Sequence, residues 1–191
     1  MHLWLGKYSQ FRDVRMNRCD QDNSGTKTAQ AELERALVFL KEHHVMSLGL
    51  ADADAPHCCS LMYVHKGFTL YWLSDPRTRH STIIDAREGG VSAMVTIAPN
   101  CSHFQDVRGL QLTGYAVRVR NLKETTVALI MLQRRYSLPV EIDRQTSALA
   151  SAMLKARIYR FTPQKAVFID NTAGFGAKFQ FTTEELLDVS E

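Results

Sequence analysis

The sequence predicts a mainly β protein with peripheral helices (α+β), built on an antiparallel barrel. Two observations predict this class. Strand-length apolar runs follow one another through short turns instead of alternating singly with helices, which disfavours a doubly wound sheet. A glycine, Gly114, falls inside the longest of these runs, where a bend or bulge would let the sheet curl.

The composition of the chain limits the classes of protein to which it can belong. The chain has 191 residues, 45% of them apolar and 23% charged, and can bury a core without disulfides. Its net charge of +3 is too small and too interspersed for a nucleic-acid footprint. With no signal peptide and no run of about 18 apolar residues, we expect a cytoplasmic protein with no membrane partner. The four cysteines, Cys19, Cys58, Cys59 and Cys101, are expected to be free thiols.

The first half of the chain divides into an arm, a helix and three strands. Residues 1–28 are polar and irregular and predict a flexible N-terminal arm. Apolar residues at helical spacing predict a helix from Ala29 to His43. Strand-like runs follow at 45–51, 58–65 and 68–74. The last of these is apolar on both faces, as in a barrel wall that packs inward on a core and outward on a helix or a second subunit.

The second half adds a short helix, further strands and a helical insert. The expected elements are a helix over 82–87, strands over 91–97 and 107–119, an insert over about 122–156, and strands over 157–162 and 166–169. Asn121 with Glu124, and Thr182 with Glu185, have the spacing of helix-start capping boxes. The main domain is therefore 29–182, with a short C-terminal helix or tail over 183–191.

The segment from Ser74 to Ser81 (SDPRTRHS) carries the most chemical information. It places two arginines, a histidine and several hydroxyls between a strand and a helix start, where free backbone N–H groups favour an anion. Arginine grips phosphate oxygens through paired hydrogen bonds. Composition alone fits equally well a turn capped by Asp75 with solvated arginines.

The stretch from about Leu33 to Phe181 resembles the pyridoxamine 5′-phosphate oxidase-like FMN-binding split-barrel family, in particular its little-characterised bacterial branch. The segments 45–84, 107–119 and 156–179 carry the resemblance. It implies a six- to seven-stranded antiparallel split β-barrel and a homodimer with FMN at the subunit interface. The family's phosphate-binding positions fall on Thr78, Arg79 and His80, with Arg77 and Ser74 behind them.

The resemblance also implies that the flavin ring runs along the two preceding strands. The residues there are Cys59, Ser60, Trp72 and Leu73. Gln111 is a candidate for a hydrogen bond to the flavin edge, although a solvent-facing strand residue would fit the same alternation. Lys178 follows a glycine-rich loop that could approach a ligand, and a solvated lysine is the plainer interpretation.

These expectations lead to a flavin-dependent oxidoreductase with no assigned catalytic side chain. The tail 170–178 lacks the Arg-x-His pair of the oxidase that names the family, so oxidation of pyridoxamine phosphate itself is not expected. The alternative is a non-catalytic module that binds flavin, haem or a deazaflavin, and a weaker one makes the helical insert an interaction surface. The histidines form no metal motif, since His57, His65 and His103 have no partner at ligand spacing, and no metal site is assigned.

Overall fold

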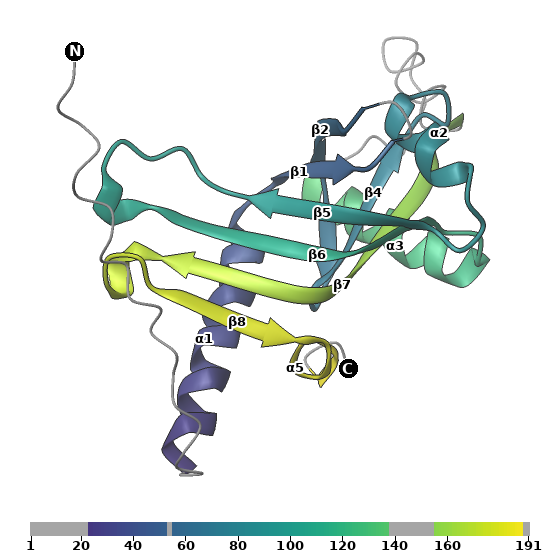
Figure 1. The fold of residues 1–191 in the computed structure, drawn as a ribbon. Helices are drawn as coiled ribbons and strands as arrows, with labels where there is room; N and C mark the ends of the chain where they lie inside the picture. The colour runs from purple at the N-terminus through teal and green to yellow at the C-terminus, as the bar shows by residue number, and fades with distance from the viewer. Residues whose placement is uncertain (1–22, 53–54, 138–154, 189–191) are drawn as a thin grey trace, which may run out of the picture.

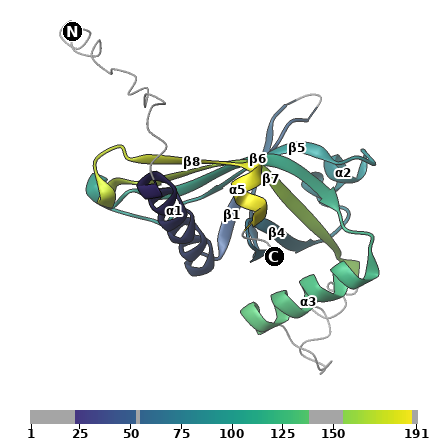
Figure 2. The same ribbon diagram turned by 90° about the horizontal axis from the view of Figure 1, so that it is seen from below.

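The computed structural model describes residues 23–52, 55–137 and 155–188. Its strands form one curled antiparallel sheet of eight strands in the order β2-β1-β5-β6-β7-β4-β3, with β8 pairing on β7 (Figure 1). Helices α1 and α3 cover different parts of this sheet (Figure 2). The predicted fold class is confirmed, with eight strands in place of six to seven.

The element bounds follow the chain. The strands are β1 (Val45–Leu50), β2 (His57–Met62), β3 (Val64–Lys66), β4 (Thr69–Ser74), β5 (Val91–Ile97), β6 (Arg108–Arg118), β7 (Arg157–Asp170) and β8 (Lys178–Thr182). The helices are α1 (Asn23–Glu42), α2 (Arg79–Asp85), α3 (Leu122–Tyr136) and α5 (Thr183–Asp188), and the 3-10 turns are η1 (Phe104–Asp106) and η2 (Asn171–Ala173).

Helix α1 closes the main core. Its buried residues Leu33, Ala36 and Leu40 recur at helical spacing and pack against the inner face of the sheet. The helix begins at Asn23, six residues before the predicted start, so the end of the predicted arm is helical. Residues 1–22, which make up the rest of that arm, lie outside the described part of the chain.

The sheet curls where β6 meets β7. Both strands are long, and the pairing register shifts between Thr113 and Gly114, as the glycine predicted. A Cβ on Gly114 would lie 2.1 Å from the carbonyl oxygen of Thr162, so only glycine fits this close approach. Pro163 of β7 pairs with Gly114 at this register shift, where a proline is tolerated in a sheet. Strand β7 therefore continues through the proline, where the sequence had predicted two separate strands.

Strand β4 packs on both of its faces, as its composition predicted. Leu70 and Trp72 face the main core, whereas Tyr71 and Leu73 pack on a second cluster. That cluster lies under α3 and includes Leu132. The barrel wall is thereby held between its own core and a helix.

Two features of the strands were not predicted. The expected strand 58–65 is interrupted at Tyr63, which ends β2 and separates it from β3. Strand β8 was absent from the predicted elements, and it pairs with β7 from Lys178 to Thr182. Strands β3 and β8 are short. Short runs contain too few residues for hydrophobic periodicity to identify a strand.

The helix starts agree well with the capping spacings. The side chain of Asn121 accepts a hydrogen bond from the backbone N–H of Glu124 at 3.1 Å. At the C-terminal helix, the backbone N–H of Thr182 donates to Glu185 at 2.7 Å. The second half of the predicted insert, from 138 to 154, lies outside the described residues. Among the helices that are described, none has the length and apolar character needed to cross a membrane.

Candidate functional site

The basic turn, Asp75–Ser81, connects the end of β4 to α2. The Asp75 carboxylate accepts a hydrogen bond from the backbone N–H of Arg77 at 2.8 Å, which tightens the turn. Thr78 is extended (φ −70, ψ 150) and occupies the N-cap position. Helix α2 therefore begins three residues before the predicted start at Thr82, and the last three residues of the turn are helical.

The two arginines of the turn are paired with carboxylates. The guanidinium of Arg77 donates to Asp75 at 2.7 Å, and these hydrogen bonds lower the pKa of the Asp75 carboxyl to about 2. Arg79 reaches back to Asp52, with 3.1 Å between Nη2 and Oδ2. Both guanidiniums remain exposed, at 84% and 54% of their side-chain surface. The two positive charges expected from the sequence are present at the turn, but each arginine forms an ion pair with a nearby aspartate.

His80 lies on the inner side of the turn. Its Nε2 is 2.5 Å from Ser74 Oγ and 3.1 Å from Thr78 Oγ1, and Thr78 Oγ1 is 2.9 Å from Ser81 Oγ. Burial lowers the pKa of the His80 imidazole, and the neighbouring His57 lowers it further. A lowered pKa favours the neutral ring, so this histidine does not supply the fixed positive charge that a lysine would.

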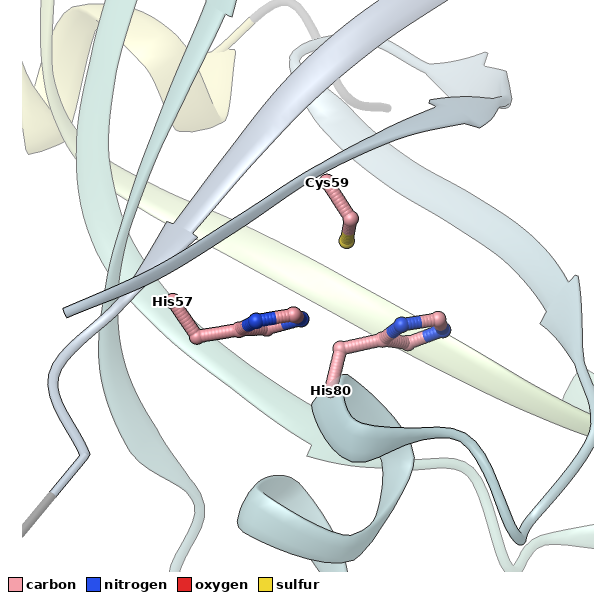
Figure 3. Close-up of side chains that lie close together, drawn as sticks. All are labelled: His57, Cys59 and His80. Atoms are coloured by element: carbon pink, nitrogen blue, oxygen red, sulfur yellow. The ribbon is translucent and has the colours of Figure 1, made fainter. Parts of the chain in front are cut away.

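Three potential metal-binding side chains meet beside this turn. The Cys59 thiol and one ring nitrogen from each of His57 and His80 all lie within 4.8 Å of one another. Figure 3 shows the thiol pointing toward the space between the two imidazole rings. The rings are nearly parallel, at 9°, with centroids 6.2 Å apart. Burial raises the pKa of the Cys59 thiol, and the adjacent Cys58 adds to this rise.

Sequence reasoning missed this cluster because its members lie far apart in the chain. His57 and Cys59 alternate on β2 and therefore point to the same face of that strand. His80 comes from α2, which packs beside β2. The His-x-Cys alternation was the available signal, and nothing in the sequence indicated which later histidine would face it.

The predicted ring-contacting residues of β4 have structural roles. Trp72 is fully buried in the main core and stacks on Tyr159, with ring centroids 5.7 Å apart. The Leu73 side chain points to the opposite face, under α3. Both side chains pack in these clusters, so we expect a ligand beside β4 to contact the strand backbone.

Ser60 and Gln111 lie on what we call the outer face of the sheet. Cross-strand pairing places them in one row that crosses four adjacent strands. Ser60 lies on β2 at one end of the row, Ser47 and Thr96 lie between, and Gln111 lies on β6 at the other end. Neighbouring strands lie about 4.8 Å apart, so the two side chains are roughly 14 Å from each other. The outer face comprises Val45, Ser47, Gly49, Cys58, Ser60, Met62, Ser92, Met94, Thr96, Gln111, Thr113 and Tyr115.

Lys178 is remote from the basic turn within one chain. It pairs with Ile169 near the end of β7, whereas Ser74 pairs with Arg157 at the start of that strand. Figure 1 shows the corresponding separation between the start of β8 and α2. The structure therefore joins Ser74, Thr78 and His80 in one cluster, keeps Arg77 and Arg79 beside it, and leaves Lys178 at the far end of the sheet.

Comparison with known proteins gives distant relatives. No family model matches the chain. A UPF0306 protein from Klebsiella pneumoniae is 28% identical over 145 residues, covering 75% of this chain and 88% of the relative. A UPF0306 protein from Photorhabdus laumondii is 26% identical over 142 residues, covering 73% and 88%.

Solved structures agree on the fold. A protein of the pyridoxinephosphate oxidase family from Clostridium acetobutylicum, related to general stress protein 26, superposes with a TM-score of 0.58 at 10% identity, covering 82% of this chain and 98% of that one. A heme binding protein from Mycobacterium smegmatis superposes with a TM-score of 0.63 at 14% identity, covering 82% and 60%. The architecture is thus the split barrel of pyridoxamine 5′-phosphate oxidase-like proteins.

Proposed function

We propose that this protein binds FMN and acts as a flavin-dependent oxidoreductase of the pyridoxamine 5′-phosphate oxidase-like class. The observation that carries the proposal is the basic turn between β4 and α2, where Thr78 leaves the first turn of the helix without a side-chain cap and Arg79 presents a guanidinium beside it. The split-barrel fold supports it, since one structural neighbour is described as belonging to the pyridoxinephosphate oxidase family.

The donor set of the turn fits a phosphate. The guanidinium of Arg79 is half exposed and can turn from Asp52 to an incoming phosphate. The Thr78 side chain makes no capping hydrogen bond to the helix backbone, which leaves that role to a ligand oxygen. His80 would contribute as a neutral imidazole, because burial lowers its pKa.

The outer face supports the proposed homodimer. Its twelve residues on β1, β2, β5 and β6 include no charged side chain, although the exposed Lys165 of β7 pairs with Thr113 at its edge. Met62, Met94 and Tyr115 are 53%, 58% and 46% exposed there. Exposed apolar side chains that gather on one face of a sheet are typical of an interaction surface. A second copy of the chain would cover it, and the flavin ring would lie between the subunits along the backbone of β2 and β4.

The chain's own residues would bind and orient the cofactor. Bound FMN supplies hydride or electron transfer, and the protein supplies the phosphate anchor, ring burial and the electrostatics around the ring. No described side chain has the placement of an obvious acid or base, so no catalytic residue is assigned. The 170–178 segment has no Arg-x-His pair, and we expect a substrate other than pyridoxamine phosphate.

Titration of the purified protein with FMN tests the proposal. We expect quenching of flavin fluorescence at one FMN per chain, and an Arg79→Ala variant that binds FMN more weakly by about 1.5 to 3 kcal/mol, or roughly 10- to 150-fold. Arg87→Ala, at an exposed arginine just after α2, is the matched control and should bind normally. A protein that neither carries nor takes up flavin would refute the proposal.

A second candidate is a cofactor-binding module without turnover. It is favoured by the superposition on a protein described as heme binding, which extends over 82% of this chain. Absorption spectra after addition of haemin or FMN distinguish the two ligands. Reduction of bound FMN by NADH or NADPH, followed by steady turnover, would exclude the non-catalytic alternative.

A further inference from the structure

We infer that His57, Cys59 and His80 form a binding site for one transition-metal ion of the zinc type. The site shares His80 with the proposed phosphate anchor, but the inference does not depend on whether flavin binds. Its three donors come from two elements, β2 and α2, and already lie within 4.8 Å of one another. Figure 3 shows them arranged around a common space.

The His57 imidazole has an unsatisfied nitrogen that points to a missing partner. Its Nε2 is buried and has no hydrogen-bond partner among the described residues. Buried polar atoms are nearly always paired, because leaving one unpaired costs its hydration. A metal ion held between His57 and its two neighbours would supply the partner that the protein does not.

His80 is already oriented as a metal ligand would be. The Thr78 hydroxyl proton has two acceptors, the carbonyl oxygen of Asp75 at 2.8 Å and Ser81 Oγ at 2.9 Å, so toward His80 Nε2 at 3.1 Å Thr78 Oγ1 acts as the acceptor. That nitrogen therefore carries the ring proton, which it donates to Ser74 Oγ at 2.5 Å. Nδ1 is left with the lone pair. Metal-binding histidines are commonly fixed in this way through a hydrogen bond from the second ring nitrogen.

The donor set selects the ion. Two imidazoles and a thiolate suit Zn²⁺ and neighbouring transition metals, whereas Mg²⁺ and Ca²⁺ prefer oxygen ligands. A tetrahedral Zn²⁺ needs donor atoms roughly 3.3 to 3.6 Å apart, so the side chains would close by about 1 Å around the ion. Three protein ligands leave a fourth position open to water or an anionic oxygen. A haem iron would use at most two of the three donors.

Zinc and cobalt titrations of untagged, metal-free protein test the site. No flavin is added, so the result is independent of whether FMN binds. We expect one Zn²⁺ per chain in competition with a chromophoric chelator, and a Co²⁺ complex with a thiolate charge-transfer band. Cys59→Ser should abolish that band and weaken Zn²⁺ binding by at least about 100-fold.

Cys58→Ser is the matched control. Cys58 is adjacent in sequence, but its thiol is exposed on the outer face, so its loss should leave Zn²⁺ affinity and the Co²⁺ band unchanged. His57→Gln provides a second variant if Cys59→Ser fails to fold, and it should lose affinity to a similar extent. Equal losses in the two cysteine variants, or no stoichiometric uptake by the wild-type protein, would overturn the inference.

Discussion

Ser74 Oγ and His80 Nε2 lie 2.5 Å apart and join the last residue of β4 to the first turn of α2. Both side chains are buried, at 9% and 7% exposure. The contact fixes the His80 ring at the inner side of the basic turn, where His57 stacks beside it. Ser74 therefore holds the His80 ring in its orientation.

The first prediction concerns this contact. Ser74→Ala should lower the free energy of unfolding by about 1 to 2 kcal/mol, because a buried imidazole nitrogen loses its nearer partner. It should also weaken Zn²⁺ binding by about 10- to 100-fold, as loss of a supporting hydrogen bond does in other metal sites. Nitrogen-15 chemical shifts of the His80 ring should show the Nε2–H form in the wild-type protein.

Two variants separate positioning from general damage. Ser74→Thr keeps the hydroxyl and should retain most of the metal affinity. Ser92→Ala removes a hydroxyl from the outer face and should behave as the wild type does. If Ser74→Ala and Ser92→Ala bind Zn²⁺ equally well, the positioning role is wrong.

The second prediction concerns the bend in β6. A Cβ at Gly114 would lie 2.1 Å from Thr162 O and 2.8 Å from the Cα of Pro163, so the backbone itself must move. Gly114→Ala should therefore lower the free energy of unfolding by about 1 to 3 kcal/mol, measured by urea denaturation. At Gly89 an added Cβ has no atom within 4 Å. Gly89→Ala is thus the control, and an equal loss in both variants would contradict the close-packing explanation.

The sequence predicted most of the fold because its central strands are regular. In β5 the exposed and buried positions alternate without exception, with Val91, Ala93, Val95 and Ile97 inside. Such a pattern identifies both the strand and its buried face. The pairing of β8 with β7 could not be obtained in this way, because it depends on two strands meeting across the loop at Gly174 and Gly176.

The candidate site was predictable only where its residues are contiguous. The turn around Thr78 was identified because hydroxyls and arginines follow one another directly after a strand. The Arg79–Asp52 ion pair and the approach of His57 to His80 bridge residues more than twenty positions apart. Contacts of this kind depend on how β2 and α2 pack, which local patterns do not contain.

The third prediction concerns Arg135, near the end of α3. Its guanidinium donates to the carbonyl oxygens of Lys41 at 3.0 Å and His43 at 2.5 Å, and lies over the Tyr63 ring. Lys41 lies in the last turn of α1 and His43 directly follows it, where helix geometry leaves carbonyl acceptors unpaired. Charge-assisted hydrogen bonds to such groups are worth more than neutral ones, so Arg135→Ala should cost about 2 to 3 kcal/mol of stability.

The neighbouring Arg134 is exposed and provides the control for the Arg135 experiment. Arg134→Ala should change the free energy of unfolding by less than about 0.5 kcal/mol. Arg135→Lys keeps the charge but not the paired donors, and it should fall between the other two variants. Identical midpoints for the alanine variants in thermal or urea unfolding would show that the link between α3 and α1 contributes nothing.

The last prediction is a dependence of stability on pH through His65 in β3. Burial lowers the pKa of the His65 imidazole below its ordinary value of 6.5, although a hydrogen bond to the Gly67 carbonyl oxygen raises it and Arg135 and Lys41 lower it further. The unfolded chain therefore binds a proton at a higher pH than the folded chain does. By linkage, this histidine costs no stability above pH 6.5, and stability is lost as the pH falls from 6.5 through the folded pKa.

Removing the His65 imidazole should reduce the loss of stability at low pH. We expect His65→Gln to reduce the fall in unfolding free energy between pH 7 and pH 5, measured by urea denaturation at several pH values. Some loss should remain, because burial lowers the pKa of His80 in the same direction. His103→Gln removes an exposed histidine and should keep the wild-type slope. If His65→Gln also keeps that slope, protonation of His65 does not limit the stability of the folded chain in acid.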